Sequence, residues 1–192
     1  MTSLFPHATV GIAGLGGLGS NIAAMLARAG VGRLVVADFD VVEQSNLNRQ
    51  NYFVSHIGTP KTEATKWMLT QTNPSCVVEA HTVRITADNV ADIFKDCDIV
   101  CEALDDPEQK AMFVNTILTR LPNVKLVAAS GMAGTASANN IRTRRITQNF
   151  YLCGDGESEA GSSLPVHAPR MMLCAAHQAN MVLRLLFGQI EP

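Results

Sequence analysis

The first forty residues pass from an apolar run to a glycine cluster, an amphipathic segment and a second apolar run. The apolar runs cover residues 8–15 and 33–37, and the segment between them extends from Leu18 to about Ala29 with apolar residues at helical spacing. Short apolar runs are typical of buried strands, and the 3.6-residue period is typical of a helix. This order predicts the first half of a nucleotide-binding α/β unit, with Asp38 at the end of the second strand.

The alternation of strands and helices continues through the middle of the chain. Thr59 and Pro60 are expected to cap and open the next helix, with Pro60 at its first position. We expect, in order, a helix to residue 73, a strand at 76–83, a short helix at 86–95, a strand at 98–104, a helix from 107 and a strand from 125. Such alternation predicts a parallel sheet with right-handed crossovers.

The pattern changes after residue 137. Residues 138–153 alternate polar and apolar without a helix between them, which predicts an antiparallel hairpin at the sheet edge. Residues 154–169 are expected to form a loop, and a helix from Arg170 to Phe187 is expected to end at Gly188. We therefore predict an α/β fold: a single domain over residues 1–192 with a Rossmann-like, mostly parallel sheet, helices on both faces and an antiparallel extension near the C-terminus.

Composition and charge narrow the functional classes. The formal charge is −2 with both signs mixed along the chain, so no nucleic-acid or anionic-membrane partner is expected. We find neither a signal peptide nor an apolar run long enough for a membrane span, and we expect a soluble, cytoplasmic protein. The five cysteines include no C-x-x-C pair, so reduced thiols and no structural zinc are expected.

The glycine cluster predicts a phosphate-bearing ligand. Gly14, Gly16 and Gly19 have the G-x-G-x-x-G spacing. In such a turn the first glycine permits the bend, the second lets a phosphate approach the backbone, and the third lets helix and strand pack closely. Asp38 follows about 20 residues later, where an acid holds ribose hydroxyls. A purely structural turn is the alternative, and by default the pattern would indicate an NAD-dependent oxidoreductase.

Three charged residues favour a triphosphate over NAD. Arg49, Lys61 and Asp105 are all expected near the carboxyl ends of the strands, where ligands bind in such sheets. Arginine and lysine can neutralise β- and γ-phosphates, and an aspartate can hold Mg²⁺ that bridges them. Each residue has a plainer alternative: Arg49 in a surface salt bridge, Lys61 solvated at a helix start, and Asp105, like Asp106, complementing a helix dipole.

The motifs GxGGLGS, DFDxVxxSNLNRQ and GxPK, followed by an Asp at the end of the fourth strand, resemble the ThiF/MoeB/HesA family. These proteins are relatives of the adenylating domain of ubiquitin-activating enzymes. The resemblance extends from about Val10 to Asp105 and resumes at APRMMLCAAHQANMVLRLLFG. The short form looks most like the compact ThiF-type proteins associated with thiamine biosynthesis.

The resemblance implies ATP-dependent adenylation of the C-terminal Gly-Gly carboxylate of a small ubiquitin-like (ThiS-like) sulfur-carrier protein, with Mg²⁺ and as a homodimer. By motif position, Gly17 would approach the phosphates and Asp38 would hold the ribose. Asn46 would support Arg49 on the phosphates, Lys61 would bind phosphate and stabilise the transition state, and Asp105 would coordinate Mg²⁺.

The chain also departs from the family pattern. It starts almost directly at the first strand, so we expect no N-terminal arm that carries an arginine to the partner subunit's site. Glu102 stands where an Asp is common, and Cys153 is the one cysteine near a plausible peptide-binding loop, with a packed thiol as the alternative. An NAD-dependent oxidoreductase, an inactive scaffold, and adenylation of a molybdopterin-type carrier, a peptide or a modified tRNA stay open as rival functions.

Overall fold

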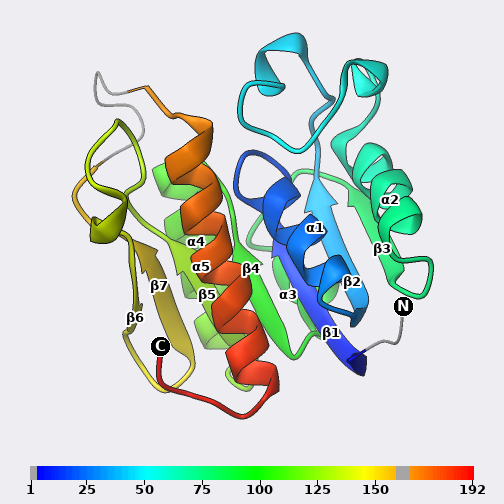
Figure 1. Ribbon diagram of the computed structural model, residues 1–192. Coiled ribbons are helices and arrows are strands. Elements are labelled where there is room, and N and C mark those ends of the chain that lie inside the picture. The colour runs from blue at the N-terminus through cyan, green and yellow to red at the C-terminus, as the bar shows by residue number, and fades with distance from the viewer. Residues whose placement is uncertain (1–3, 159–164) are drawn as a thin grey trace.

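A seven-stranded sheet forms the centre of the computed structural model, which describes residues 4–158 and 165–192 (Figure 1). The strand order is β3-β2-β1-β4-β5-β7-β6, and every neighbouring pair is parallel except β6 with β7. The strands are β1 (Phe5–Ala13), β2 (Val31–Asp38), β3 (Val77–Thr82), β4 (Ile99–Glu102), β5 (Lys125–Ala129), β6 (Arg142–Arg145) and β7 (Phe150–Gly154). The predicted parallel sheet and its antiparallel edge hairpin are confirmed.

Helices cover both faces of the sheet (Figure 1). One face carries α1 (Gly19–Arg28), α2 (Lys61–Thr72) and α5 (Ala168–Leu186), and the other carries α3 (Val90–Phe94) and α4 (Pro107–Arg120). Each face has its own buried apolar cluster, one around Ile12 and Ile22 and the other around Phe94 and Phe113. No helix in the described part of the chain is long and apolar enough to cross a membrane.

The start of α2 differs from the sequence prediction. The helix begins at Lys61, Pro60 occupies the N-cap position with an extended ψ of 134°, and no side-chain cap is present, so the assignments of Thr59 as N-cap and Pro60 as first helical residue are wrong. The cause is tertiary pairing. Pro60 forms an antiparallel bridge with Val41, and the Lys61 amide donates to the Asp40 carbonyl at 2.9 Å, which holds this segment extended.

Two other elements are shorter than predicted. Helix α3 begins at Val90 instead of residue 86, because the Asn89 side chain accepts a hydrogen bond from the Thr86 amide at 2.8 Å and holds the preceding residues in a turn. Strand β4 ends at Glu102, before residue 104, because the Leu104 amide donates to the Glu102 carboxylate and not to a neighbouring strand.

Candidate functional site

The glycine turn between β1 and α1 has the geometry that its spacing predicts. Gly14 has a φ of +89°, a conformation that L side chains rarely adopt. A Cβ on Gly19 would come within 1.8 Å of the Gly14 carbonyl oxygen, so α1 can pack on the turn only with glycine there. A Cβ on Gly16 would meet nothing closer than 3.9 Å. Gly16 therefore leaves open space above the turn.

Gly17 lines the cavity and also allows close packing against α5. A Cβ at this position would lie 1.6 Å from the sulfur of Met171 near the start of α5. Both residues line the main cavity of the molecule. The absence of a side chain at Gly17 thus lets α5 approach the glycine turn.

The acid that ends β2 is fixed to the glycine turn. Asp38 is 8% exposed, and its carboxylate accepts hydrogen bonds from the Leu15 amide at 2.6 Å and the Asp40 amide at 2.8 Å. Burial raises the pKa of Asp38, against the opposing effects of the Lys61 charge and these hydrogen bonds. Its position at the cavity wall is the one predicted for a ribose-binding acid.

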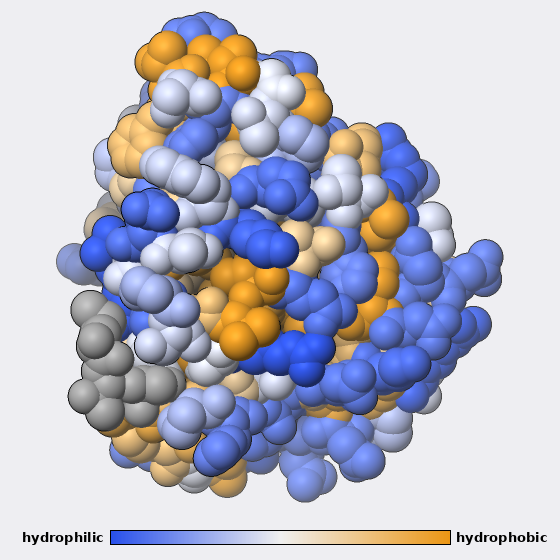
Figure 2. Space-filling model, turned by 90° about the vertical axis from the view of Figure 1, so that its right-hand side faces the viewer, coloured by the Kyte–Doolittle hydropathy of each residue, from blue (hydrophilic) through white to orange (hydrophobic). Residues whose placement is uncertain are grey.

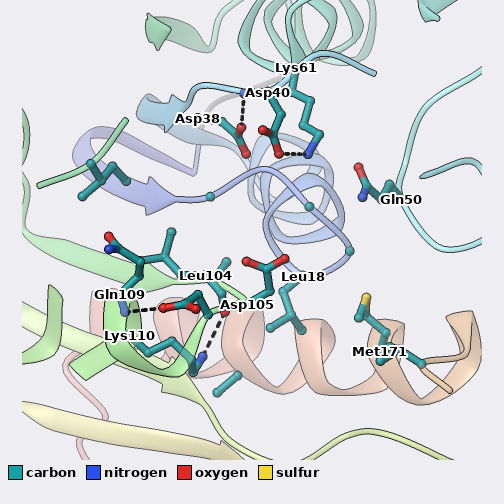
Figure 3. Close-up of a pocket in the computed structure, with 18 of the residues that line it drawn as sticks. Leu18, Asp38, Asp40, Gln50, Lys61, Leu104, Asp105, Gln109, Lys110 and Met171 are labelled. Atoms are coloured by element: carbon teal, nitrogen blue, oxygen red, sulfur yellow. Dashed lines mark hydrogen bonds and ion pairs between the residues drawn. The ribbon is translucent and has the colours of Figure 1, made fainter. Parts of the chain in front are cut away.

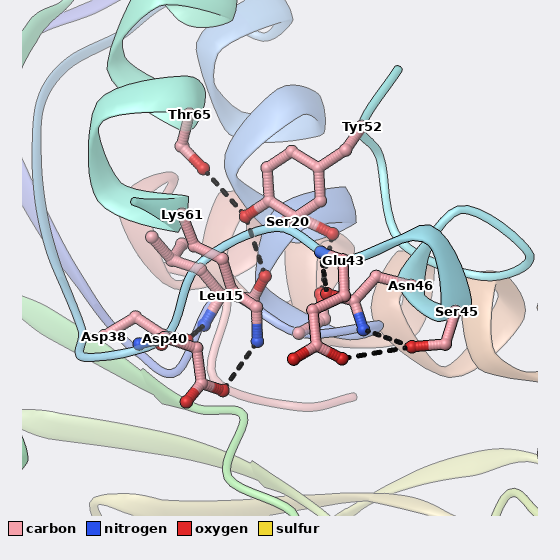
Figure 4. Close-up of polar contacts among 11 residues, drawn as sticks. Leu15, Ser20, Asp38, Asp40, Glu43, Ser45, Asn46, Tyr52, Lys61 and Thr65 are labelled. Atoms are coloured by element: carbon pink, nitrogen blue, oxygen red, sulfur yellow. Dashed lines mark hydrogen bonds and ion pairs between the residues drawn. The ribbon is translucent and has the colours of Figure 1, made fainter. Parts of the chain in front are cut away.

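Lys61 is a buried side chain and not a solvated one. It is 6% exposed, and its ammonium forms an ion pair with the Asp40 carboxylate at 2.8 Å (Figure 4). Both side chains line the cavity beside the glycine turn. The alternative of a solvated lysine at a helix start is therefore wrong for Lys61.

The loop that carries Arg49 is fastened to the glycine turn by three side chains. The Tyr52 hydroxyl donates to the Leu15 carbonyl at 2.8 Å (Figure 4). The Asn21 amide donates to the carbonyls of Gly17 and Arg49 at 2.6 and 3.3 Å. The Ser20 hydroxyl, in turn, accepts a hydrogen bond from the Asn51 amide at 3.0 Å. These bonds set where the Arg49 backbone lies relative to the turn.

Arg49 makes no ion pair with any described residue. Its guanidinium donates to two neutral oxygens, the Ser45 carbonyl at 3.2 Å and the Asn48 side chain at 2.9 Å, and it lines the cavity. The surface salt bridge considered from the sequence is therefore absent within residues 4–158 and 165–192. Asn46, predicted to support Arg49 at the nucleotide, is buried and is not among the residues that line the cavity; its carbonyl accepts from the Arg49 amide at 3.2 Å and so supports the loop.

The two acids after β4 have different environments. Asp106 is the N-cap of α4 and accepts from the Gln109 amide at 2.9 Å, which confirms the prediction that it complements the helix start. Asp105 lines the cavity, is exposed, and forms no hydrogen bond or ion pair with the described residues (Figure 3). A free carboxylate there fits Mg²⁺, which takes one or two protein carboxylates and otherwise water and phosphate oxygens.

Sequence reasoning missed a buried ion pair between Glu102 and Lys110, which precede and follow Asp105 in the chain. Glu102, with a side chain 1% exposed, contacts the Lys110 ammonium through both carboxylate oxygens at 2.8 Å. Lys110 also donates to the Leu104 carbonyl at 3.1 Å (Figure 3). Burial raises the pKa of Glu102, although the Lys110 charge acts in the opposite direction. The pair connects the end of β4 to the first turn of α4, and the short turn that carries Asp105 lies between them.

One cavity is lined by the glycine turn, Asp38, Arg49, Lys61 and Asp105. It has a volume of about 700 Å³, within the usual range for ligand sites, and is lined from the ends of β1, β2, β4 and β5 and from α5. At the β2 side, the Arg84 guanidinium lies 3.7 Å from the centroid of the Phe39 ring, and both residues line the cavity. Gln50, also missed from the sequence, lies at the glycine turn with a buried side-chain oxygen that has no partner among the described residues.

Cys153, the one cysteine expected near a peptide-binding loop, does not line this cavity. Its side chain is fully buried between β7 and α5, and burial raises the pKa of its thiol to about 11. All five cysteines are buried and free. The structure therefore supports a packed thiol at this position.

A glycine turn, a strand-end acid and a cavity at the carboxyl ends of parallel strands define a Rossmann-like α/β protein. The model of the ThiF family matches residues 5–192, and the chain belongs to that family.

The relatives include proteins with larger chains. Adenylyltransferase and sulfurtransferase UBA4 of Eremothecium gossypii is 33% identical over 138 residues, which are 71% of this chain and 31% of that protein. Sulfur carrier protein adenylyltransferase of Thermus thermophilus is 41% identical over 101 residues, 52% of this chain and 37% of that protein. The chain thus spans about a third of the length of these relatives.

Solved structures share the fold. Escherichia coli tRNA N6-threonylcarbamoyladenosine dehydratase, TcdA, in complex with ATP superposes with a TM-score of 0.86 at 22% identity, covering 97% of this chain and 88% of that one. E. coli MccB with ATP gives a TM-score of 0.75 at 24% identity, covering 98% and 58%.

Proposed function

We propose that this protein transfers the adenylyl group of ATP to the C-terminal carboxylate of a ubiquitin-like sulfur-carrier protein, with release of pyrophosphate. One observation carries the proposal: a single cavity brings two basic side chains and a free carboxylate to a glycine turn. An NAD site has no need of this charge set, whereas a triphosphate does. The ATP complexes of TcdA and MccB, which share the fold, support ATP as the nucleotide.

The residues have distinct tasks in this proposal. The open space above Gly16 admits phosphate to the backbone, and Asp38 holds the ribose. Arg49 donates only to neutral oxygens, so its guanidinium can bind the phosphates without breaking an ion pair with an acidic residue. Lys61 shares its charge between Asp40 and the ligand.

Asp105 would hold Mg²⁺, which neutralises phosphate charge when bound. The remaining contribution of the protein is to orient the acceptor carboxylate toward the α-phosphorus and to stabilise the charge that develops there.

The identity of the acceptor rests on the relatives. The Thermus protein is named for a sulfur carrier, and UBA4 is named as an adenylyltransferase and sulfurtransferase. We therefore favour a ThiS-like carrier with a Gly-Gly terminus and a role in thiamine biosynthesis. Another carrier, a peptide and a modified tRNA are the acceptors against which it must be tested, since TcdA is named for a tRNA.

We further propose that the protein acts as a homodimer. Apolar side chains interrupt the polar surface on the side that carries α2 and β3 (Figure 2). They include Trp67 on α2 and Phe53, Val54 and Ile57 in the loop before it. Sedimentation equilibrium of the wild type beside Trp67→Glu tests this: a monomeric wild type contradicts the proposal, and a dimer that Trp67→Glu dissociates supports it.

The decisive experiment is carrier-dependent ATP–pyrophosphate exchange. Purified protein is mixed with Mg-ATP, labelled pyrophosphate and a Gly-Gly-ending carrier, beside Arg49→Ala, Lys61→Ala and Asp105→Ala. Each variant should lose about 2–4 kcal/mol of transition-state stabilisation, roughly 30- to 1,000-fold in rate. Lys66→Ala, at an exposed lysine of α2 that makes no ion pair with described residues, is the matched control and should keep full activity.

Each other outcome has a definite meaning. Exchange without carrier, or with tRNA or peptide in its place, reassigns the acceptor. Tight binding of NADH with no binding of ATP overturns adenylation altogether. ATP binding with no exchange for any acceptor indicates a scaffold that has kept its nucleotide.

A further inference from the structure

A buried ion pair outside the proposed nucleotide site joins two loops to the first turn of α5. Arg170 is 5% exposed, and its guanidinium donates to the carboxylate of Asp155. The same guanidinium donates to the carbonyls of Ala136 at 2.6 Å and Ser137 at 2.8 Å through Nη1, and to that of Met132 at 3.4 Å through Nε. One side chain therefore fastens the segment after β5 and the segment after β7 to the same helix.

Asp155 completes the connection from the other side. Its Oδ1 accepts from the amides of Glu157 and Ser158, both at 2.9 Å, and its Oδ2 accepts from the Ser158 hydroxyl. Its own amide donates to the Gly131 carbonyl at 3.0 Å. Burial alone would raise the pKa of Asp155, but the hydrogen bonds from Ser158 and Glu157 and the charge of Arg170 bring it to about 2. The carboxylate is thus ionised, and both of its oxygens already accept hydrogen bonds from the protein.

The two loops form one wall of the cavity. Ser130, Gly131 and Met132 follow β5, Ser158 follows β7, and all four line the cavity; we name them the acceptor wall. A Cβ on Gly131 would come within 2.0 Å of Asp155 Oδ1, so the wall lies directly against the ion pair.

Strand order assigns the acceptor wall to the second substrate. Asp38 ends β2 and Asp105 follows β4, so a nucleotide that reaches both lies across the carboxyl ends of β2, β1 and β4. The space that remains lies after β5 and β7. The acceptor wall presents no charged side chain to repel an incoming carboxylate.

We propose that the Asp155–Arg170 pair positions the acceptor tail by holding the acceptor wall in place. This inference rests on the proposed function. Both side chains are buried and their polar atoms are used, so neither touches the substrate. Their role is to keep the wall at the distance from the glycine turn at which a carrier C-terminus reaches the α-phosphorus.

Arg170→Lys is the main test. Lysine keeps a positive charge for Asp155, but its single ammonium cannot also reach the three carbonyls that the planar guanidinium bridges. In the exchange assay we expect the KM for the carrier to rise about tenfold, while the Kd for ATP without carrier changes less than about twofold. Glu191→Gln is the matched control. It removes the exposed Arg145–Glu191 pair, 3.0 Å long, and should change neither quantity.

Ser158→Ala and Ser158→Thr give an independent test that leaves Arg170 intact, and they serve if Arg170→Lys does not fold. Alanine removes the hydroxyl bond to Asp155 and should raise the carrier KM about threefold, whereas threonine keeps the hydroxyl and should restore it. If ATP affinity falls in step with carrier affinity, the pair supports the fold only and the inference is wrong.

Unchanged carrier KM in these variants, with an active wild type, overturns the inference alone. A wild type that shows no carrier-dependent exchange overturns the proposed function and the inference with it.

Discussion

Replacing Lys110 with methionine tests how much the buried Glu102–Lys110 pair contributes to the stability of the fold. The Lys110 ammonium contacts both oxygens of Glu102 at 2.8 Å, and the Glu102 side chain is 1% exposed. Methionine has a similar length and no charge, so Lys110→Met leaves a buried carboxylate whose partners are the backbone amides of Leu104, at 2.7 Å, and Ala129.

The expected cost follows from this burial. Removing one partner of a buried ion pair costs about 3–5 kcal/mol, because the remaining charge is left uncompensated. The Lys110 side chain is 24% exposed and the Leu104 amide still donates to Glu102, so the low end applies, about 3 kcal/mol. For a chain of 192 residues each kcal/mol shifts Tm by about 2–4 °C, which gives a fall of about 6–12 °C.

Urea unfolding at several pH values measures this cost. Burial raises the pKa of Glu102 and the Lys110 charge opposes that rise, so the variant should have a still higher pKa. A carboxyl with a raised folded-state pKa stabilises the fold when protonated, and this stability is lost as pH rises through that pKa. The cost of Lys110→Met should therefore be largest at pH 8 and shrink toward pH 5.

Lys66→Met is the control for removal of a lysine charge. Lys66 is an exposed lysine of α2, and its replacement should change stability by less than about 0.5 kcal/mol. A loss under about 1 kcal/mol for Lys110→Met at pH 8, or a loss that grows on acidification, would refute the assignment of Glu102–Lys110 as a buried charged pair.

Three further predictions concern other positions. Gly19→Ala should lower the free energy of unfolding by about 2 kcal/mol or more, because its Cβ would lie 1.8 Å from the Gly14 carbonyl, whereas Gly16→Ala should keep its Tm and lose about tenfold or more in ATP affinity by calorimetry. A thiol reagent at pH 7.5 should modify none of the five buried cysteines before unfolding, and fast reaction of Cys153 would contradict its raised pKa of about 11. Asp155→Asn should cost about 1–2 kcal/mol at neutral pH, and the difference from wild type should shrink as pH falls from 4 through the lowered pKa of about 2, since the acid loses its stabilising effect as it is protonated; a difference that stays constant between pH 4 and pH 2 would contradict this.

Local patterns predicted the sheet and the glycine turn because their physical causes are local. Apolar runs of strand length and a 3.6-residue period depend on neighbouring residues alone, and the spacing of Gly14, Gly16 and Gly19 encodes one tight turn. The start of α2 was predicted wrongly, because the bridge between Val41 and Pro60 is a tertiary contact that overrides capping preference.

The two ion pairs were missed for the same reason, because each is a tertiary contact between separate parts of the chain. Glu102 and Lys110 are eight residues apart on different elements, and Asp155 and Arg170 are fifteen apart. The members of each pair do not share a helix or strand, so the period of a single element does not connect them. Once β4 and α4 are recognised, a weak signal remains for Lys110: it lies in the first turn of α4, near the end of the strand that precedes it.

The pairing of charges in the cavity separates the groups that hold the fold from those that remain for a ligand. Lys110 is neutralised by buried Glu102, and Lys61 is shared with Asp40, whose side chain is 45% exposed. Arg49 bonds only to neutral oxygens, and Asp105 bonds to no described residue. Because an uncommitted charge gains most from a ligand of opposite sign, Arg49→Ala should weaken ATP binding with little change in Tm. Lys110→Met should instead lower Tm more than it weakens ATP binding. If Lys110→Met weakened ATP binding more than Arg49→Ala did, the phosphates would lie nearer Lys110 than Arg49, and the assignment of Arg49 to the phosphates would be wrong.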